Sequence, residues 1–279
     1  MTERNAIIRK KACTAAKYIF LTVAAVVMIL PFFWMVISSF KANAEVFDST
    51  IFFPSQWRWQ NYPEALSLAP FGIFFRNSII VTIVCVASQL ITCSMAGFAF
   101  ARLDFRFRDA IFRIFLACLM IPNEATVISN YITVSKLGLV NTFPALMLIS
   151  LTSVLGIFIM RQFFKTVPAE LMEAAEIDGC GIARTFVRIF LPVGKSSLAT
   201  VGVFGMISSW NDYMWPLVVT SSTKYKTVQT GIRYLISEDT GSQWGYIMAM
   251  SAVIVLPVII VFVFLQKYFI QGIAKVGLK

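Results

Sequence analysis

Six stretches of this sequence are each long enough and apolar enough to cross a lipid bilayer, and they constrain the fold more than any motif does. A helix of about 20 residues spans the roughly 30 Å hydrocarbon core of a membrane. Because each stretch reaches that length with one charged residue or none, the chain is predicted to be an all-α membrane protein with six transmembrane helices. The stretches are Tyr18–Phe40, Ser78–Ala101, Ile114–Ser135, Leu137–Met160, Ser196–Thr223 and Thr240–Gln266.

The overall composition supports this class of protein. Hydrophobic residues make up 58% of the 279 residues, charged residues only 14%, and the mean hydropathy is +0.77. A soluble domain usually carries about a quarter charged residues. The first stretch is longer than the core of a signal peptide, so we expect it to be retained. We expect residues 1–279 to form a single transmembrane domain.

Basic residues are unevenly distributed over the segments that connect the six stretches. Seventeen of the 24 Lys and Arg residues lie in the N-terminal segment, the second and fourth connections and the C-terminal segment. Because cytoplasmic segments of membrane proteins are enriched in Lys and Arg, both termini are predicted to be cytoplasmic. The net charge of +10 is spread over several loops rather than gathered on one face, so no nucleic-acid partner is expected.

Residues suited to catalysis or metal binding are largely missing. The sequence has no histidine, and its five cysteines show no C-x-x-C spacing, so no catalytic residue, metal site or disulfide is predicted. Gly194-Lys195-Ser196 looks like the end of a phosphate-binding loop, but such a loop needs a glycine at the position that Ile189 occupies. We therefore expect no cofactor and no ATPase site in this chain.

A charged segment, Glu173–Pro192, interrupts the apolar sequence between the fourth and fifth stretches. Pro168 and the glutamates that follow it suit the first turns of a helix, where a missing N–H costs nothing and a carboxylate meets the positive end of the helix dipole. Gly179 can take the left-handed conformation that ends a helix. The spacing alone allows two interpretations: an amphipathic helix that lies on the membrane, or a helix whose face binds another protein. Its predicted contact face holds Leu171, Ala174, Ala175 and Asp178.

The order Glu173-Ala174-Ala175, Gly179, Ile189, Leu191 and Pro192 resembles the EAA loop of the permeases of ABC importers, with every spacing in register. The resemblance covers nearly the whole chain and implies the type I importer permease fold. It also implies that the loop at about residues 166–195, including Asp178, forms a cytoplasmic coupling helix that docks on an ATPase subunit.

Shorter matches resemble the carbohydrate branch of that family, the permeases similar to the smaller maltose permease subunit. They are Pro31-Phe-Phe-Trp34, Ala96–Arg102, Trp210-Asn211-Asp212-Tyr213 and Gln266–Gly272. The resemblance implies a carbohydrate cargo. It implies as partners a second permease in a heterodimer, two ATPase subunits that bind ATP and Mg²⁺, and an extracytoplasmic solute-binding protein. It also implies that the chain lies in the cytoplasmic (inner) membrane, in contact with its lipid. Two alternatives stay open: an ABC importer permease for a polyol or glycerol phosphate, and an ion-coupled secondary transporter.

Glu124 and Asp212 are the two charged residues inside the six stretches. Charges inside a bilayer usually face a water-filled path or a partner. Amides and aromatic rings accompany them, and such side chains suit a sugar, which stacks on rings and hydrogen-bonds through its hydroxyls. One alternative is that the acids complete helix ends or contact the sister permease. The predicted substrate path comprises Glu124, Asn130, Trp210, Asn211, Asp212 and Tyr213.

The second connection begins Arg102-Leu-Asp-Phe-Arg-Phe-Arg-Asp109 and alternates charged and aromatic residues. Aromatic and basic side chains are both enriched where a membrane protein meets the lipid headgroups. We interpret this connection as an anchor at the cytoplasmic membrane surface, with a contact to a partner subunit as the alternative.

Overall fold

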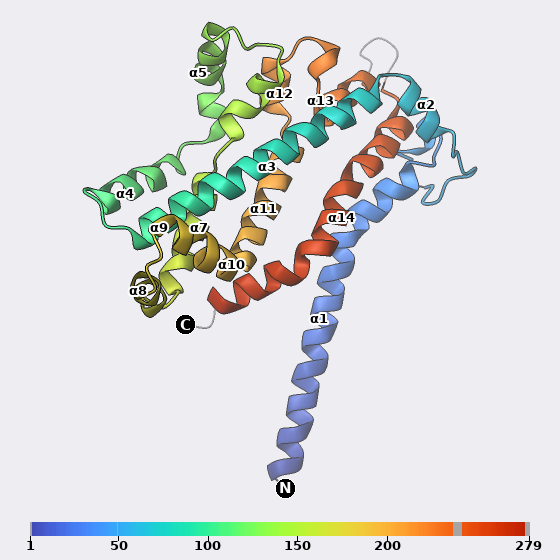
Figure 1. Ribbon diagram of the computed structural model, residues 1–279. Coiled ribbons are helices and arrows are strands. Elements are labelled where there is room, and N and C mark those ends of the chain that lie inside the picture. Colours follow the sequence, from blue (N-terminus) through green and yellow to red (C-terminus); the bar gives the residue numbers. More distant parts are fainter. Residues whose placement is uncertain (1, 49, 237–241, 277–279) are drawn as a thin grey trace. The chain divides into compact units, whose positions relative to one another are not determined.

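Helices make up every regular element in the part of the chain that the structure describes (Figure 1). This computed structural model describes residues 2–48, 50–236 and 242–276, and the side chains of residues 2–10, 12 and 267–276 lie outside the description. The all-α prediction is confirmed. The α-helices are α1 (Thr2–Ser38), α2 (Asn61–Ser67), α3 (Phe71–Arg102), α4 (Arg108–Cys118), α5 (Asn123–Lys136), α6 (Phe143–Met147), α7 (Val154–Thr166), α8 (Glu170–Ile177), α9 (Ile182–Thr185), α10 (Leu191–Val193), α11 (Lys195–Trp210), α12 (Met214–Val219), α13 (Val228–Gly231) and α14 (Trp244–Val276).

Short helical turns of other kinds connect several of these helices. The 3₁₀ turns are η1 (Asn43–Glu45), η2 (Leu148–Ser150), η4 (Thr223–Tyr225) and η5 (Ile232–Leu235). A π-helical turn, η3 (Phe186–Phe190), joins α9 to α10. It lies inside the charged segment that the sequence singles out.

Three helices are long and apolar enough to cross a membrane without a break: Cys13–Ser38 within α1, the whole of α3, and Trp244–Gln266 within α14. Three more candidates are pairs of helices bent at a short break. The bend is 101° between α4 and α5, 41° between Phe143–Ser150 and α7, and 79° between Ile182–Val193 and α11. Counting each bent pair as one span gives up to six spans within the described residues, the number that the sequence predicts.

Three of the predicted spans are not single helices. Ile114–Ser135 is interrupted between α4 and α5, Leu137–Met160 between η2 and α7, and Ser196–Thr223 between α11 and α12. In these three places the structure divides a predicted transmembrane stretch into two helices. Apolar content sets the length of a candidate span, but local backbone chemistry decides whether it stays helical.

Each interruption has a local cause. Pro122 lacks a backbone N–H and disfavours the helical conformation in the residue before it, so α4 ends and α5 starts afresh. The Ser153 hydroxyl accepts a hydrogen bond from the backbone N–H of Gly156 at 3.1 Å and starts α7. The Asp212 carboxylate accepts from the N–H of Trp215 at 3.3 Å at the start of α12. A proline at one break and side-chain hydrogen bonds at the other two therefore start the new helices.

The chain packs into two compact units. The first unit is Met1–Ala69 with Tyr234–Val253, and the second is Pro70–Arg233 with Ile254–Lys279. The second unit carries both predicted sites. The single-domain organisation expected from composition stays a prediction.

Hydrogen bonds from buried polar side chains organise the first unit. The Asn61 side chain is buried, and its amide donates to the backbone carbonyls of Ser39 at 2.8 Å and Lys41 at 3.0 Å. Tyr246 donates its hydroxyl proton to a carboxylate oxygen of Glu64 at 2.6 Å. These bonds tie α2 to the end of α1 and to the start of α14.

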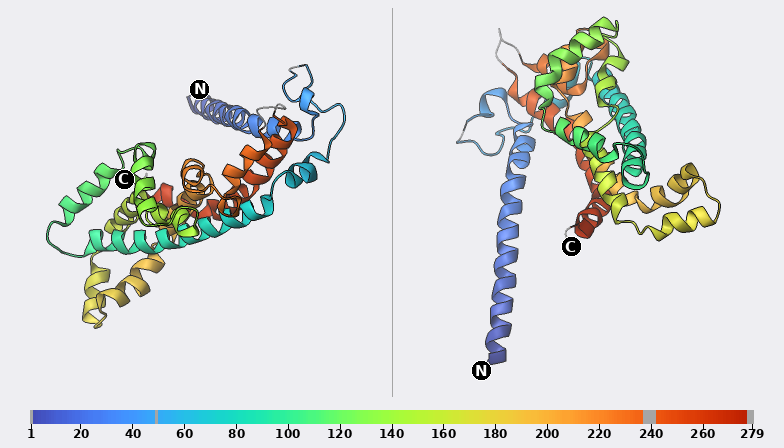
Figure 2. Two further views of the ribbon diagram at one scale, coloured as in Figure 1. Left: turned by 90° about the horizontal axis from the view of Figure 1, so that it is seen from above. Right: turned by 90° about the vertical axis from the view of Figure 1, so that its left-hand side faces the viewer.

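α3 is the central helix of the second unit and packs along α7 and α11 (Figures 1 and 2). Small residues allow the backbones to approach closely, as in many membrane helix pairs. A Cβ atom on Gly97 would lie 2.5 Å from Cβ of Met160, and one on Gly156 would lie 2.7 Å from Sγ of Cys93. A larger side chain at either glycine would push α3 and α7 apart.

A buried aromatic cluster fixes the segment that leads into the predicted coupling loop. The ring centroids of Phe98 and Phe190 are 4.9 Å apart, and those of Phe164 and Phe190 are 5.7 Å apart. At the end of α3, the guanidinium group of Arg102 donates to the backbone carbonyls of Phe164 and Val167. The loop therefore leaves the protein from a base that is held to α3.

Candidate coupling loop and substrate path

Helix α8 is the first half of the predicted coupling loop, and its end is defined by backbone geometry. Gly179 has a φ of 70°, the left-handed conformation predicted for it. Its N–H donates to the carbonyl of Glu176 at 3.0 Å, and the N–H of Cys180 donates to the carbonyl of Ala175 at 2.8 Å. This pair of bonds is a Schellman motif, which satisfies carbonyls that the last helical turn leaves free. The predicted helix and its glycine break are both confirmed.

The predicted contact face of α8 does not behave as one surface. Ala175 is buried, with 2% of its surface exposed, whereas Leu171, Ala174 and Asp178 are exposed. Neighbouring residues of a helix point about 100° apart, so Ala174 and Ala175 lie on different sides of it. Ala175 is therefore inaccessible to a partner, while Ala174 is available to one.

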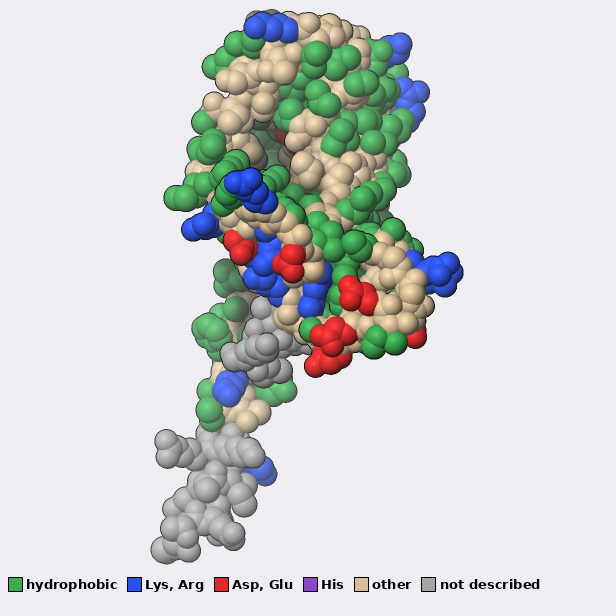
Figure 3. Space-filling model, turned by 60° about the vertical axis from the view of Figure 1, so that its left-hand side comes forward, with side chains coloured by type: hydrophobic (Ala, Val, Ile, Leu, Met, Phe, Trp, Pro, Cys, Tyr) green, Lys and Arg blue, Asp and Glu red, His purple; other side chains and the backbone are tan. Residues whose placement is uncertain are grey.

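The exposed side of α8 is acidic with an apolar tip. Four acids, Glu170, Glu173, Glu176 and Asp178, are exposed on or next to this helix, as is Ile177, whose side chain is 87% exposed. Acidic side chains gather over this part of the chain at the lower end of the face in Figure 3. The sequence reasoning missed Ile177. The available signal was an isoleucine among four acids within the nine residues 170–178.

The second half of the loop serves mainly to anchor it. Ile189 and Leu191 are half-buried beside the buried Phe190, and Pro192 is exposed. Pro192 lacks the N–H that an α-helix would use at this point. The residues before it form the π-helical turn η3. The N–H of Leu191 closes this turn by donating to the carbonyl of Phe186. The Ile-x-Leu-Pro part of the motif therefore lies in the irregular helical segment that leads from α9 into α11.

A row of polar side chains on α3 holds the break between η2 and α7. Gln89 donates from Nε2 to the carbonyl of Ser150 at 2.7 Å. The Ser88 hydroxyl donates to the carbonyl of Leu151 at 2.7 Å. Irregular backbone at membrane depth is tolerated only where its polar groups are satisfied by protein or water. The sequence reasoning missed this row, whose signal is the polar spacing Ser88, Gln89, Thr92, Cys93 within an apolar helix.

Asp212 lies in the break between α11 and α12 and is half-buried. Its bond to the N–H of Trp215 makes it a helix-end residue, one of the alternatives that the sequence leaves open. Trp210 is buried, and its indole N–H donates to the carbonyl of Ile254 at 3.1 Å. The ring face of Trp210 is therefore committed to packing rather than open to a ligand.

The other predicted path residues are more accessible. Tyr213 is 40% exposed, and Asn211 is exposed and accepts from Nε2 of Gln229 at 3.2 Å. Glu124 is exposed in the first turn of α5, and Asn130 follows on the same helix, half-buried. Because α5 packs against α12, the structure brings the two acid-bearing segments into one region of the second unit.

Comparison with known proteins decides which family this arrangement belongs to. The family model described as "binding-protein-dependent transport system inner membrane component" matches residues 93–275. The chain belongs to this family. The matched region of the permease includes the loop of α8 and the break that contains Asp212.

Individual members align with the permease over almost its full length. It is 34% identical to the arabinooligosaccharides transport system permease protein AraQ of Halalkalibacterium halodurans, over 91% of this chain and 92% of that protein. It is 30% identical to the lactose transport system permease protein LacG of Rhizobium radiobacter, over 95% and 96%. It is 28% identical to the sn-glycerol-3-phosphate transport system permease protein UgpE of Yersinia pestis, over 92% and 94%.

A solved structure confirms the fold of the permease. A chain in the crystal structure of a bacterial ABC transporter involved in the import of the acidic polysaccharide alginate superposes with a TM-score of 0.80. The match covers 94% of this chain and 98% of that chain at 22% sequence identity. The type I importer permease fold that the resemblance implied is therefore confirmed.

Proposed function

We propose that this chain is the permease subunit of an ATP-driven importer for a carbohydrate, and that it forms half of the translocation path. Two of the relatives named above carry sugars in their names, which supports the cargo class. The observation that carries the coupling role is α8. It ends in a Schellman cap and presents exposed acidic residues together with the exposed apolar side chain of Ile177.

The proposed assembly contains a second permease, two ATPase subunits and an extracytoplasmic binding protein. ATP and Mg²⁺ bind to the ATPase subunits. Closure of those subunits moves α8, and the aromatic base at Phe98, Phe164 and Phe190 passes the motion to α3 and α7. The excess of basic residues in the second and fourth connections supports placing α8 on the cytoplasmic side, together with both termini.

The proposed substrate path follows the region where α5 meets the break between α11 and α12. Glu124, Asn130, Asn211 and Tyr213 offer hydrogen-bonding groups and an aromatic face to a sugar. Asp212 and Trp210 have structural partners, so we assign them to positioning this region. Asp212 holds the start of α12, and Trp210 fixes the end of α11.

The coupling role is tested by Ala174→Arg in the complete transporter, reconstituted with its partners. We expect this variant to insert into the membrane but to lose both ATPase association and sugar uptake, because Ala174 is exposed on α8. Ala44→Arg is the matched control, since Ala44 is exposed in the first unit, on the predicted external side. Normal uptake and ATPase recovery with Ala174→Arg would refute the coupling role.

The alternative cargo, glycerol phosphate, is favoured by one observation, the similarity to UgpE. Stimulation of ATP hydrolysis by loaded binding protein separates the two cargo classes. A carbohydrate importer responds to sugars and ignores glycerol phosphate. Uptake that persists without ATP and collapses with an ionophore would favour the ion-coupled carrier instead.

A further inference from the structure

The connection between α3 and α4 is a short one between two candidate membrane spans. Five residues, Leu103–Phe107, join the end of α3 to the start of α4. α3 is a candidate span, and α4 with α5 forms another. Five extended residues reach at most about 18 Å. When both candidates cross the bilayer, this connection, which we call the 103–107 link, therefore joins their ends on one side of the membrane.

The backbone of the 103–107 link turns an aromatic ring outward. Phe107 has a φ of 64°, a left-handed conformation that is rare for a bulky side chain. Its ring is 62% exposed, and that of Phe105 is 41% exposed. The guanidinium carbon of Arg106 lies 4.6 Å from the centroid of the Phe107 ring. The exposed Phe107 ring and the positively charged Arg106 side chain are therefore next to each other on the surface.

The nearby carboxylates are already engaged by other arginines. Asp104 accepts from Arg108 at 2.8 Å, and Asp109 accepts from Arg161 at 2.9 Å. Arg161 is itself buried, with its guanidinium carbon 3.9 Å from the centroid of the Phe112 ring. Both acids close to the link are therefore paired with arginines other than Arg106 and Arg113.

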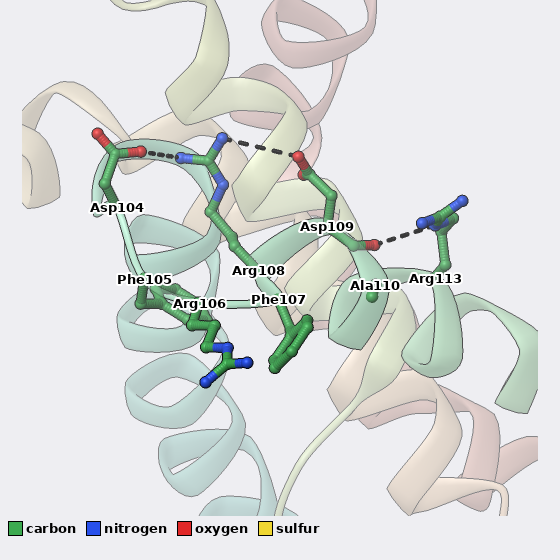
Figure 4. Close-up of a pocket in the computed structure, with 8 residues that line it drawn as sticks. All are labelled: Asp104, Phe105, Arg106, Phe107, Arg108, Asp109, Ala110 and Arg113. Atoms are coloured by element: carbon green, nitrogen blue, oxygen red, sulfur yellow. Dashed lines mark hydrogen bonds and ion pairs between the residues drawn. The ribbon is translucent and has the colours of Figure 1, made fainter.

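Two arginines of the same region are left without a carboxylate partner among the described residues. The guanidinium group of Arg106 lies over the Phe107 ring. Arg113 donates from Nε to the backbone carbonyl of Asp109 at 3.3 Å. Figure 4 shows Arg106 and Phe107 on the side of the link that faces away from the two carboxylates. A surface depression of about 630 Å³ is lined by Asp104, Phe105, Arg106, Phe107, Arg108, Asp109, Ala110 and Arg113.

We propose that the 103–107 link and the first turns of α4 bind the headgroups of anionic phospholipids. Arg106 and Arg113 pair with the lipid phosphate, and the rings of Phe105 and Phe107 insert at the boundary between headgroups and acyl chains. The short tether to two candidate spans, the surplus positive charge and the outward rings all fit a lipid surface. The surface proposed for the ATPase has the opposite charge and lies on α8. This inference goes beyond the proposed function and does not depend on the cargo.

Photocrosslinking identifies what the link touches. Phe107 is replaced by p-benzoylphenylalanine in the complete transporter, which is reconstituted in bilayers of phosphatidylcholine and phosphatidylglycerol, and the adducts are identified by mass spectrometry. We expect phosphatidylglycerol adducts in excess of the mole fraction of that lipid. Each of Arg106→Gln and Arg113→Gln is expected to lower this preference about fivefold, the ratio that corresponds to ~1 kcal/mol per basic residue near an anionic surface.

Three controls make the result decisive. Arg184→Gln removes an exposed charge from α9 and is expected to leave the lipid preference unchanged. Arg106→Lys with Arg113→Lys retains the charge and is expected to preserve the preference. The same probe at Ile177 is expected to crosslink to the ATPase. Loss of that signal alone would refute the coupling role and leave the lipid site intact. Protein adducts from Phe107, or lipid adducts without headgroup preference, would overturn the lipid site.

Discussion

Single residues decide how the coupling loop is built, and the two glycines that follow α8 illustrate it. Gly179 needs its left-handed φ of 70°, while Gly181 has an ordinary φ of −70°. A Cβ atom at either position would meet nothing within 4 Å. The two glycines therefore differ only in backbone conformation. Replacing each by alanine tests the effect of backbone strain without a steric clash.

We predict that Gly179→Ala loosens the end of α8 and that Gly181→Ala does not. An alanine in the left-handed region costs about 1–2 kcal/mol, enough to lower the population of the capped end severalfold. Hydrogen exchange of the Cys180 amide, which donates to the carbonyl of Ala175, measures the effect directly. Equal exchange in the two variants would show that the Schellman cap contributes nothing to the stability of the loop.

At the scale of elements, α3 stands out because its side chains donate hydrogen bonds to backbone carbonyls of its neighbours and do not only pack against them. Its polar row supplies hydrogen bonds to the break between η2 and α7, while its glycine permits close contact with α7. Burying free carbonyls without such donors would cost several kcal/mol for each group in lipid. The bent span is therefore a property of two elements together, and α7 alone would not hold it.

We predict that Gln89→Leu destabilises the second unit by about 1–3 kcal/mol, because the carbonyl of Ser150 loses its donor in a buried place. Gln162→Leu on α7 is the control, since the Gln162 side chain is exposed. Thermal unfolding of the purified transporter in one detergent compares the two. An unchanged midpoint for Gln89→Leu would mean that water replaces the lost donor.

At the scale of the whole molecule, the proposed ATPase contact depends on an exposed apolar side chain on α8. Ile177 is 87% exposed at the end of α8, and the adjacent residues Glu176 and Asp178 are exposed acids. Exposed apolar side chains rimmed by charge commonly mark protein contacts. In the proposed assembly this tip enters the ATPase subunit.

We predict that Ile177→Ala weakens ATPase association about tenfold without lowering the unfolding temperature of the permease. The lost burial is worth roughly 1–2 kcal/mol in the complex, and nothing is lost in the permease alone because the side chain is exposed there. Ile128→Ala is the matched control, with Ile128 73% exposed on α5. Titration of ATPase subunits onto reconstituted permease gives the affinities. Equal affinities for the two variants would place the ATPase contact elsewhere.

The sequence by itself determined the class of the molecule and the outline of its loop. Six apolar stretches require lipid, and the order of Glu173, Ala174, Ala175 and Gly179 predicts a short helix with a left-handed end, because both follow from local rules of hydropathy and backbone conformation.

Only the tertiary structure decided where the spans break and what each predicted site residue does. Three apolar stretches are interrupted because Pro122, Ser153 and Asp212 act on the local backbone, and donors on α3 then make the break before α7 tolerable. Ala175 is buried while its neighbour Ala174 is exposed, and Trp210 is committed to packing by a partner 44 residues away in the sequence, Ile254. Periodicity and composition describe a residue's own segment, whereas burial and hydrogen-bond partners depend on which other segments arrive beside it.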